Sequence, residues 1–430
     1  MPFLLHGDGV PYTNVDTPQV ISIKSMASNS SVDLVQLVLV AIPKSICLST
    51  TWAPIWKHIC WSLKALAIGR HPMVDPDGKP FTDKHRSALA GKPLRKAVIT
   101  SIAGDIEWYC QEFGFPYAMS NYPCGFCQAD NFFSKEDGSS PVGERPFNDF
   151  RSCAAWRSSV YSFEQMQAKY KHPLMEVPGI SALSLKIDSL HVIDLGVAAH
   201  LYGSLLWSLI EDEKHKLGGS RESAMHYLNK QIVDEYAKLK IPAPSRTGKL
   251  LLSNICNSSQ QYPVLKHLKG RRIRHFSGVA CALAKKYANA EDQASQHRLA
   301  ACEAMHEIYV HCDRPETSWP ADVQKKFEKA VTALLAHYGF LAKHAMQMSL
   351  KRFSIVQKHH ILAHLPAQAK FLAPRMYWTY GSESFMGLVA KVGASCAAGT
   401  CKSKIPEKLL FKMRVAKQLV LKHQFQFDED

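Results

Sequence analysis

Short apolar runs separated by turn residues fill the first 195 residues, a pattern typical of mixed α/β structure. Runs that alternate or are rich in β-branched residues predict strands, and apolar residues at helical spacing predict a helix over Trp52 to Ile68. The run Leu34 to Ile42 fits a strand or a helix. The expected strands are Phe3 to Leu5, which ends at a turn over His6 to Gly9, then Gln19 to Lys24, Lys96 to Ile102 and Ser184 to Asp188.

The pattern changes after about residue 195, where apolar residues recur at helical spacing as far as residue 373. Prolines and glycines separate the segments. The expected helices are Val197 to Ile210, Arg221 to Lys238, Phe276 to Ala288, Glu291 to His311, Ala321 to Tyr338 and Leu350 to His364. We therefore expect an α/β core over residues 1–195, with a loop at 120–150, an all-α insertion over 196–370 and a C-terminal return to the core over 371–430.

The net charge of the chain indicates what kind of partner it binds. The chain has 52 Lys and Arg against 37 Asp and Glu, a net charge of +15. Such an excess favours a polyanionic partner such as nucleic acid. One window reverses the trend, because residues 101–150 hold 2 basic and 8 acidic side chains. Carboxylates gathered inside a basic protein suit a metal site that acts on phosphates.

The cellular location is expected to be nuclear or cytoplasmic. The N-terminus has neither the charged leader nor the apolar stretch of a secretory signal. Twelve cysteines with one close pair favour reduced thiols over a disulfide framework. The apolar run Val192 to Ile210 contains Asp194 and His200, so we expect no membrane span.

Three blocks of sequence resemble the DDE, RNase H-like transposases of the CACTA-like and Kyakuja/Dileera/Zisupton-like group. The first runs from Ala103-Gly-Asp105-Ile-Glu-Trp-Tyr-Cys to Cys124-Gly-Phe-Cys127. The second, Asp188-Ser-Leu-His191, looks like the [Cys/Asp]-x-x-His motif of eukaryotic cut-and-paste transposases. The third, Trp378-Thr-Tyr-Gly-Ser-Glu383-Ser-Phe-Met-Gly387, is similar to the block that carries the last catalytic acid in plant-type CACTA transposases, although Ser384 stands where a basic residue is common.

The resemblance implies an RNase H-like mixed sheet interrupted by a large all-α insertion. It also implies that Asp8, Asp105 and Glu383 are the catalytic acids and bind two Mg²⁺ or Mn²⁺ ions that act on DNA. Each acid has a rival interpretation. Asp8 can be a turn residue with Asp16 as its rival, Asp105 competes with Glu107 and can be a helix N-cap, and Glu383 can be an ordinary surface residue.

The pair Cys124 and Cys127 has the spacing of zinc ligands, but a tetrahedral site needs two more. We expect Asp188 and His191 to complete the site, with another cysteine in place of Asp188 or two reduced structural cysteines as alternatives. In the resembled families the Asp-x-x-His pair can instead lie beside the active site. His360 and His364 share one helical face, but without the Glu of a zincin motif we expect them to be structural.

The best candidate for phosphate contacts is the basic run within residues 266–275, because ammonium and guanidinium groups displace counterions from DNA. Its residues are Lys266, Lys269, Arg271, Arg272 and Arg274. The alternative is a solvated helix face. The stretch Lys402 to Lys422 predicts a helix with a basic outer face packed on the sheet.

The function expected from the resemblance is divalent-metal-dependent DNA cleavage and strand transfer. The expected partners are DNA and further copies of the chain in a homo-oligomer. Transposases of this kind carry an N-terminal DNA-recognition domain, and because Asp8 comes seven residues after Met1 we expect that domain to be missing. A catalytically inactive transposon relic that binds DNA or a protein is the alternative, and an unrelated helical protein is the third.

Overall fold

The chain forms two compact units in this computed structural model, each assembled from separated stretches of sequence. Unit 1 comprises residues 1–115, 162–188 and 377–430, and unit 2 comprises residues 116–161 and 189–376. The structure describes residues 1–13, 16–27, 35–132, 145–213, 216–256, 258 and 260–427, with side chains as far as residue 421. The fold is mixed α/β, as expected, but the segment 116–161 groups with the helical unit.

A four-stranded mixed sheet forms the centre of unit 1, in the order β3-β2-β1-β4. The strand β1 pairs antiparallel with β2 and parallel with β4, and β2 pairs antiparallel with β3. The β-branched residues of β2 and β4 suit a sheet that helices cover on both faces. The strands are β1 (Pro2–Gly9), β2 (Pro18–Ser25), β3 (Gln36–Pro43) and β4 (Val98–Ala103).

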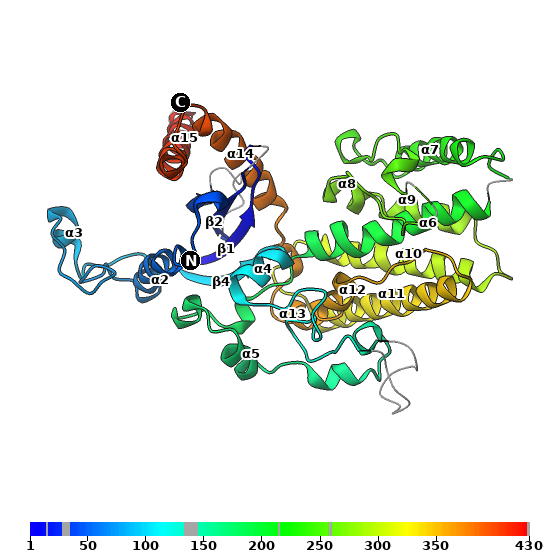
Figure 1. The fold of residues 1–430 in the computed structure, drawn as a ribbon, viewed down its shortest axis with the longest axis horizontal. Helices are drawn as coiled ribbons and strands as arrows, with labels where there is room; N and C mark the ends of the chain where they lie inside the picture. The colour runs from blue at the N-terminus through cyan, green and yellow to red at the C-terminus, as the bar shows by residue number, and fades with distance from the viewer. Residues whose placement is uncertain are drawn as a thin grey trace. The chain divides into compact units, whose positions relative to one another are not determined.

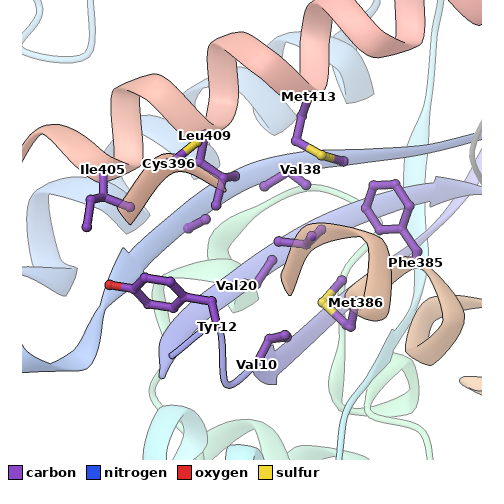
Figure 2. Packing of buried hydrophobic residues seen from close by; sticks show 12 residues of the cluster. Val10, Tyr12, Val20, Val38, Phe385, Met386, Cys396, Ile405, Leu409 and Met413 are labelled. Carbon is purple, nitrogen blue, oxygen red and sulfur yellow. The ribbon is translucent and has the colours of Figure 1, made fainter. Parts of the chain in front are cut away.

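Helices cover both faces of this sheet. Val20, opposite Asp8 in β1, faces the cluster of apolar side chains formed with α14 and α15, which Figure 2 shows around Phe385 and Met386. On the other face, Trp108 of α4 lies against Gly7. The helices of unit 1 are α2 (Trp52–Ile68), α3 (Lys84–Leu89), α4 (Ile106–Phe113), α5 (Phe163–Lys169), α14 (Tyr380–Ala397) and α15 (Ile405–Phe427), with short 3₁₀ turns at Lys44–Ile46, Pro173–Glu176, Ala182–Ser184 and Lys402–Lys404.

Unit 2 is helical in the part that the structure describes, and its two longest helices, α10 and α11, pack along each other (Figure 1). The buried side of α11 repeats every three or four residues, as in Phe327, Val331, Leu334 and Tyr338. Its helices are α6 (Ala199–Asp212), preceded by a π-helical stretch at Leu190–Ala198, α7 (Arg221–Lys238), α8 (Gly270–His275), α9 (Ser277–Lys286), α10 (Gln293–Cys312), α11 (Ala321–Gln347), α12 (Gln357–Leu362) and α13 (Leu365–Ala369). Five 3₁₀ turns lie at Pro146–Asn148, Ala155–Ser159, Ala243–Ser245, Leu252–Asn254 and Pro374–Met376.

The predicted helices over 52–68 and 221–238 are confirmed to the residue. Three other predictions are wrong. Residues 6–9 continue β1 and form no turn, and the expected strand at 184–188 is a 3₁₀ turn followed by a single parallel bridge from Leu185 to Ile102. The helix expected over 350–364 begins only at Gln357, because Phe353 has a positive φ of 54°, which a right-handed helix excludes.

One helical stretch, Leu190–Asp212, is long and apolar enough to cross a membrane. The most apolar window of this stretch is 89% buried inside the structure. The core helix of a soluble protein has the same property, so the stretch is weak evidence for a membrane span.

Candidate functional site

Four side chains of unit 2 converge into a group with the composition of a metal site. Cys124 and Cys127 come from the loop after α4, His360 comes from α12, and His364 lies directly before α13. All four are buried, and their ligand atoms lie within 4.8 Å of one another. Among the residues that the structure describes, this is the one such group of three or more His, Cys, Asp or Glu side chains.

The distances between these ligand atoms fit a tetrahedral zinc ion. Zinc bonds of about 2.3 Å to sulfur and about 2.0–2.1 Å to nitrogen require S···N distances of about 3.6 Å and an N···N distance of about 3.3 Å. Cys124 Sγ lies 3.4 Å from His364 Nε2, and Cys127 Sγ lies 3.2 Å from His360 Nε2. The two Nε2 atoms are 3.3 Å apart. The donor set and its spacing therefore suit a closed, four-ligand zinc site.

Hydrogen bonds from or to the backbone support three of the four side chains. The His360 Nδ1 atom lies 2.8 Å from the carbonyl oxygen of Phe147, so Nδ1 carries the proton and Nε2 presents its lone pair. The amides of Phe126 and Ala129 donate to the sulfurs of Cys124 and Cys127. Hydrogen bonds of this kind stabilise thiolates.

Aromatic rings pack around the two imidazoles and exclude water. Phe147 stacks on His360 at 4.2 Å, and Trp156 lies 4.5 Å from the same ring and 5.2 Å from His364. Phe126 lies 5.6 Å from His364. A divalent cation with two thiolates carries no net charge, which makes such a dry site tolerable.

The two cysteines differ in their affinity for protons. The hydrogen bond from Cys124, followed by those from His360 and His364, lowers the pKa of the Cys127 thiol despite its burial. Burial first, and then the neighbouring Cys127, raises the pKa of the Cys124 thiol. Burial also lowers the pKa of His364, which favours the neutral imidazole that a metal needs. Metal binding at this group must therefore displace the proton of Cys124.

The two cysteines are joined by His360 and His364, whereas the sequence predicted Asp188 and His191 as the other two ligands. Asp188 is buried in unit 1, where it accepts hydrogen bonds from the amide of Thr379 at 3.0 Å and from its hydroxyl at 2.6 Å. His191 belongs to the π-helical stretch and is not among the four. The prediction that His360 and His364 are merely structural overlooked that their i, i+4 spacing supplies the two ligands the Cys pair needs.

Two of the acids expected to be catalytic lie at the carboxyl ends of two neighbouring strands of unit 1, Asp8 within the end of β1 and Asp105 just after β4. The parallel pairing of β1 and β4 ends at His6 and Ala103, and Asp8 and Asp105 each come two residues later. Because the carboxyl ends of adjacent parallel strands meet at one edge of a sheet, these two acids lie at the same edge.

Glu383 lies in the first turn of α14, which covers the sheet face that His6 and Asp8 share. Its Oε1 atom is 4.0 Å from Nε2 of the buried His6, two residues before Asp8. The Glu383 side chain remains 33% exposed. Asp188 fixes the beginning of this helix, since Thr379 in turn accepts the Glu383 amide at 2.7 Å. Among the described residues the three acids do not form a group as tight as the Cys/His cluster.

Backbone contacts also engage the two aspartates. Asp8 Oδ1 accepts the Gly9 amide at 2.7 Å, and Asp105 is the N-cap of α4, where its Oδ1 accepts the Trp108 amide at 2.7 Å. The N-cap interpretation of Asp105 is therefore confirmed. It leaves a metal-binding role open, because a carboxylate has a second oxygen.

Asp16, the rival of Asp8, has a structural role. Its carboxylate accepts hydrogen bonds from the Ser45 hydroxyl and the Thr17 amide and pairs with Lys402 at 3.4 Å. Burial raises the pKa of Asp16, but the hydrogen bonds from Ser45 and Lys402 outweigh that effect and lower it overall. Asp16 thereby ties the β1–β2 connection to the segment before α15.

The basic run separates into exposed and buried members. Lys269 and Arg271 are exposed, and Lys266 and Arg272 are half-buried. Arg274 is different, because its side chain is 7% exposed, pairs with Asp313 at 2.7 Å and lies over the Tyr309 ring. The prediction that Arg274 contacts DNA is corrected accordingly, since its guanidinium already stabilises the junction of α8 with α10.

No family model matches this sequence, and no curated protein matches it either.

Proposed function

We propose that the protein is a transposon-derived DDE nuclease that cleaves DNA strands and transfers them, with Mg²⁺ or Mn²⁺ bound by Asp8, Asp105 and Glu383. The observation that supports this proposal is the register of the sheet. Asp8 and Asp105 each follow the last pair of adjacent parallel strands by two residues, and Glu383 contacts the face of β1 on which Asp8 lies.

Oxygen ligands on rigid elements suit this chemistry. Mg²⁺ prefers carboxylate oxygens and keeps several waters, so three acids suffice when substrate phosphates complete its coordination. Two such ions would activate the attacking oxygen and stabilise the leaving oxygen of a phosphodiester. The chain's own contribution is positional: strand ends hold the two aspartates, and the Asp188 to Thr379 bonds hold the helix that carries Glu383.

The Cys124, Cys127, His360 and His364 group has a supporting role in this proposal. A closed tetrahedral site leaves no open position for substrate, so zinc bound there would stabilise unit 2 and take no part in the reaction. Lys269 and Arg271, both exposed in unit 2, are the residues that we assign to the phosphate backbone of DNA.

A catalytically inactive relic that binds DNA is the second candidate. It is favoured by the contrast in ligand grouping, because the Cys/His cluster is the one group of possible metal ligands among the described residues and the three acids do not form such a group. Under this alternative the cluster and the basic surface remain, and the acids have no catalytic task.

A nicking assay on supercoiled DNA with Mg²⁺ or Mn²⁺ separates the candidates. Asp105→Asn removes the charge but keeps a good N-cap, and Asp83→Asn makes the same change at the N-cap of α3. Glu383→Gln has its control in Glu407→Gln, in the first turn of α15.

We expect the Asp105 and Glu383 variants to lose about a hundredfold or more in nicking rate, while the two controls stay near the wild-type rate. Nicking that survives both substitutions would overturn the assignment of these acids. A wild-type protein that binds DNA but never nicks it, with its zinc content intact, would favour the relic.

A further inference from the structure

Unit 2 contains a pocket that is lined neither by the Cys/His cluster nor by the proposed catalytic acids. It lies where α11 passes the segments around residues 145–151 and 350–355, and its volume is about 500 Å³. This volume falls within the range of about 300–1,000 Å³ that is typical of small-molecule sites. All of the residues that line it belong to unit 2.

The floor of the pocket exists because one face of α11 is made of small residues. Ala336 and Gly339 lie three residues apart on this face. A Cβ atom added at Gly339 would meet a single atom within 4 Å, Cδ2 of Phe150 at 3.7 Å, so the space above the helix is open. Any larger residue at position 339 would project into the pocket.

Aromatic rings form the walls. Tyr262 is 48% exposed, and no ring contact of Tyr262 exists among the described residues, so its ring presents a face to the pocket or to solvent. Phe340 is backed by His297, whose ring stacks on it at 3.7 Å with an interplanar angle of 12°. A ring supported in this way is held rigidly and is suited to stacking on a planar ligand.

The pocket is basic. Its lining includes four cations and one acid, and a second acid, Asp212, pairs with one of these cations from outside the lining, so a net charge of about +2 remains; the lining residues are Arg145, Arg151, Lys343 and Arg352, with Asp149. Arg151 is held by Asp149 through two hydrogen bonds of 3.0 and 2.8 Å, and Arg352 is held by Asp212 at 2.8 Å. These pairs fix the two guanidinium groups in place at the walls and offset their charge, so the excess positive charge of the lining comes from Arg145 and Lys343.

Two polar groups complete the lining. The carboxamide of Asn148 and the hydroxyl of Ser354 make no side-chain hydrogen bond within the part of the chain that the structure describes. Each offers both a donor and an acceptor. An Asn carboxamide matches the hydrogen-bonding edge of a nucleobase, and a hydroxyl accepts either partner.

We propose that this pocket binds one nucleotide, with the base stacked against Tyr262 and Phe340 and the phosphate at the basic side chains. An apolar ligand would make no use of the excess positive charge of the lining, and a sugar phosphate would make no use of the aromatic rings. The nucleotide can be free, or it can be an unpaired nucleotide of a DNA strand; the second source rests on the proposed function, whereas the ligand chemistry does not.

The test uses the full-length protein and fluorescence anisotropy with two DNA hairpins that differ by one unpaired nucleotide. Binding of dAMP and dTMP is measured in parallel by calorimetry. We expect the hairpin with the unpaired nucleotide to bind about tenfold more tightly than the paired one, and Gly339→Leu and Tyr262→Ala each to abolish that difference. A free nucleotide that binds without any preference for the hairpin identifies the free source and supports the pocket.

Lys343→Ala should weaken nucleotide binding, and Lys329→Ala, an exposed lysine on the same helix, should not. Circular dichroism and zinc content show whether Gly339→Leu is folded, and Tyr262→Ala provides the test if it is not. Equal affinity for both hairpins together with no binding of dAMP or dTMP would overturn the proposal. Asp105→Asn should leave these affinities unchanged, so failure of the nuclease assignment is seen separately in the nicking assay.

Discussion

The two candidate metal sites of this molecule are built in opposite ways. In unit 2, sulfur and nitrogen ligands are buried, lie close to one another and are supported by hydrogen bonds with backbone groups of neighbouring residues. In unit 1, the three acids lie at a strand edge and at a helix start, and Glu383 is one-third exposed. A closed site suits a structural ion, and an open one suits an ion that shares its coordination with a substrate.

The largest expected effect tests the closed site. Cys127→Ser or His360→Ala removes one of four zinc ligands, and structural zinc contributes an apparent 10–16 kcal/mol in small zinc-binding domains. We expect one zinc per chain in the wild type, none in either variant, and loss of cooperative unfolding in unit 2. Metal analysis and thermal denaturation measure both.

Cys153→Ser is the matched control, because Cys153 is an exposed free thiol in the same unit. Its zinc content and melting temperature should equal those of the wild type. Full zinc occupancy in Cys127→Ser would show that the closed site is not a metal site.

A smaller effect tests the sheet edge beside the acids. A Cβ added at Gly7 would lie 1.9 Å from the Trp108 indole, whereas at Gly9 the nearest atom is Cγ2 of Thr17 at 3.5 Å. Gly7→Ala must displace either β1 or the indole, so we expect it to reduce the free energy of unfolding by about 3 kcal/mol.

Gly9→Ala, on the same strand, should change the stability by less than about 1 kcal/mol. Urea denaturation of the two variants measures the difference. Equal stabilities would mean that the edge tolerates movement and does not hold Asp8 in a fixed position.

The smallest effect concerns a buried positive charge in unit 1. In unit 1, Lys186 is 4% exposed, its ammonium lies 5.5 Å from the Tyr377 ring, and no carboxylate pairs with it in the described part of the chain. Burial lowers the pKa of Lys186 from 10.5 to about 8. The folded state therefore binds this proton less tightly than the unfolded state.

The penalty for burying the ammonium is complete below pH 8 and disappears as the pH rises towards 10.5. Lys186→Met should therefore stabilise the protein at pH 7, by on the order of 2 kcal/mol, and should have no such effect near pH 10.5. Chemical denaturation at the two pH values measures this. A stabilisation that is independent of pH would mean that packing, and not charge, sets the cost of Lys186.

Periodicity made the regular elements predictable, and contacts between distant segments explain what it missed. The helix over 52–68 follows from its apolar spacing and ends at Gly69, which adopts a positive φ of 79°. The region His6 to Gly9 contains turn-forming residues but continues β1. Gly7 is needed there because only a residue without a side chain lets the Trp108 indole pack against the strand. Composition could not reveal that requirement.

The Cys/His cluster shows the same limit of prediction from local sequence. The Cys pair was visible from its spacing, but its partners lie 233 and 240 residues further along the chain. The two histidines at i, i+4 are the sequence signal for these partners, although they lack the neighbouring Glu of a zincin motif. Asp188 and His191 were nearer in sequence, yet Asp188 is used to hold Thr379.

The division of the chain gives the zinc group a topological consequence. Unit 2 consists of two separate excursions, 116–161 and 189–376, and each supplies two of the four ligands. A bound ion would therefore act as a cross-link that fastens two independently anchored loops of one polypeptide. Deleting either segment would remove two of the four ligands, so neither segment can hold such an ion alone.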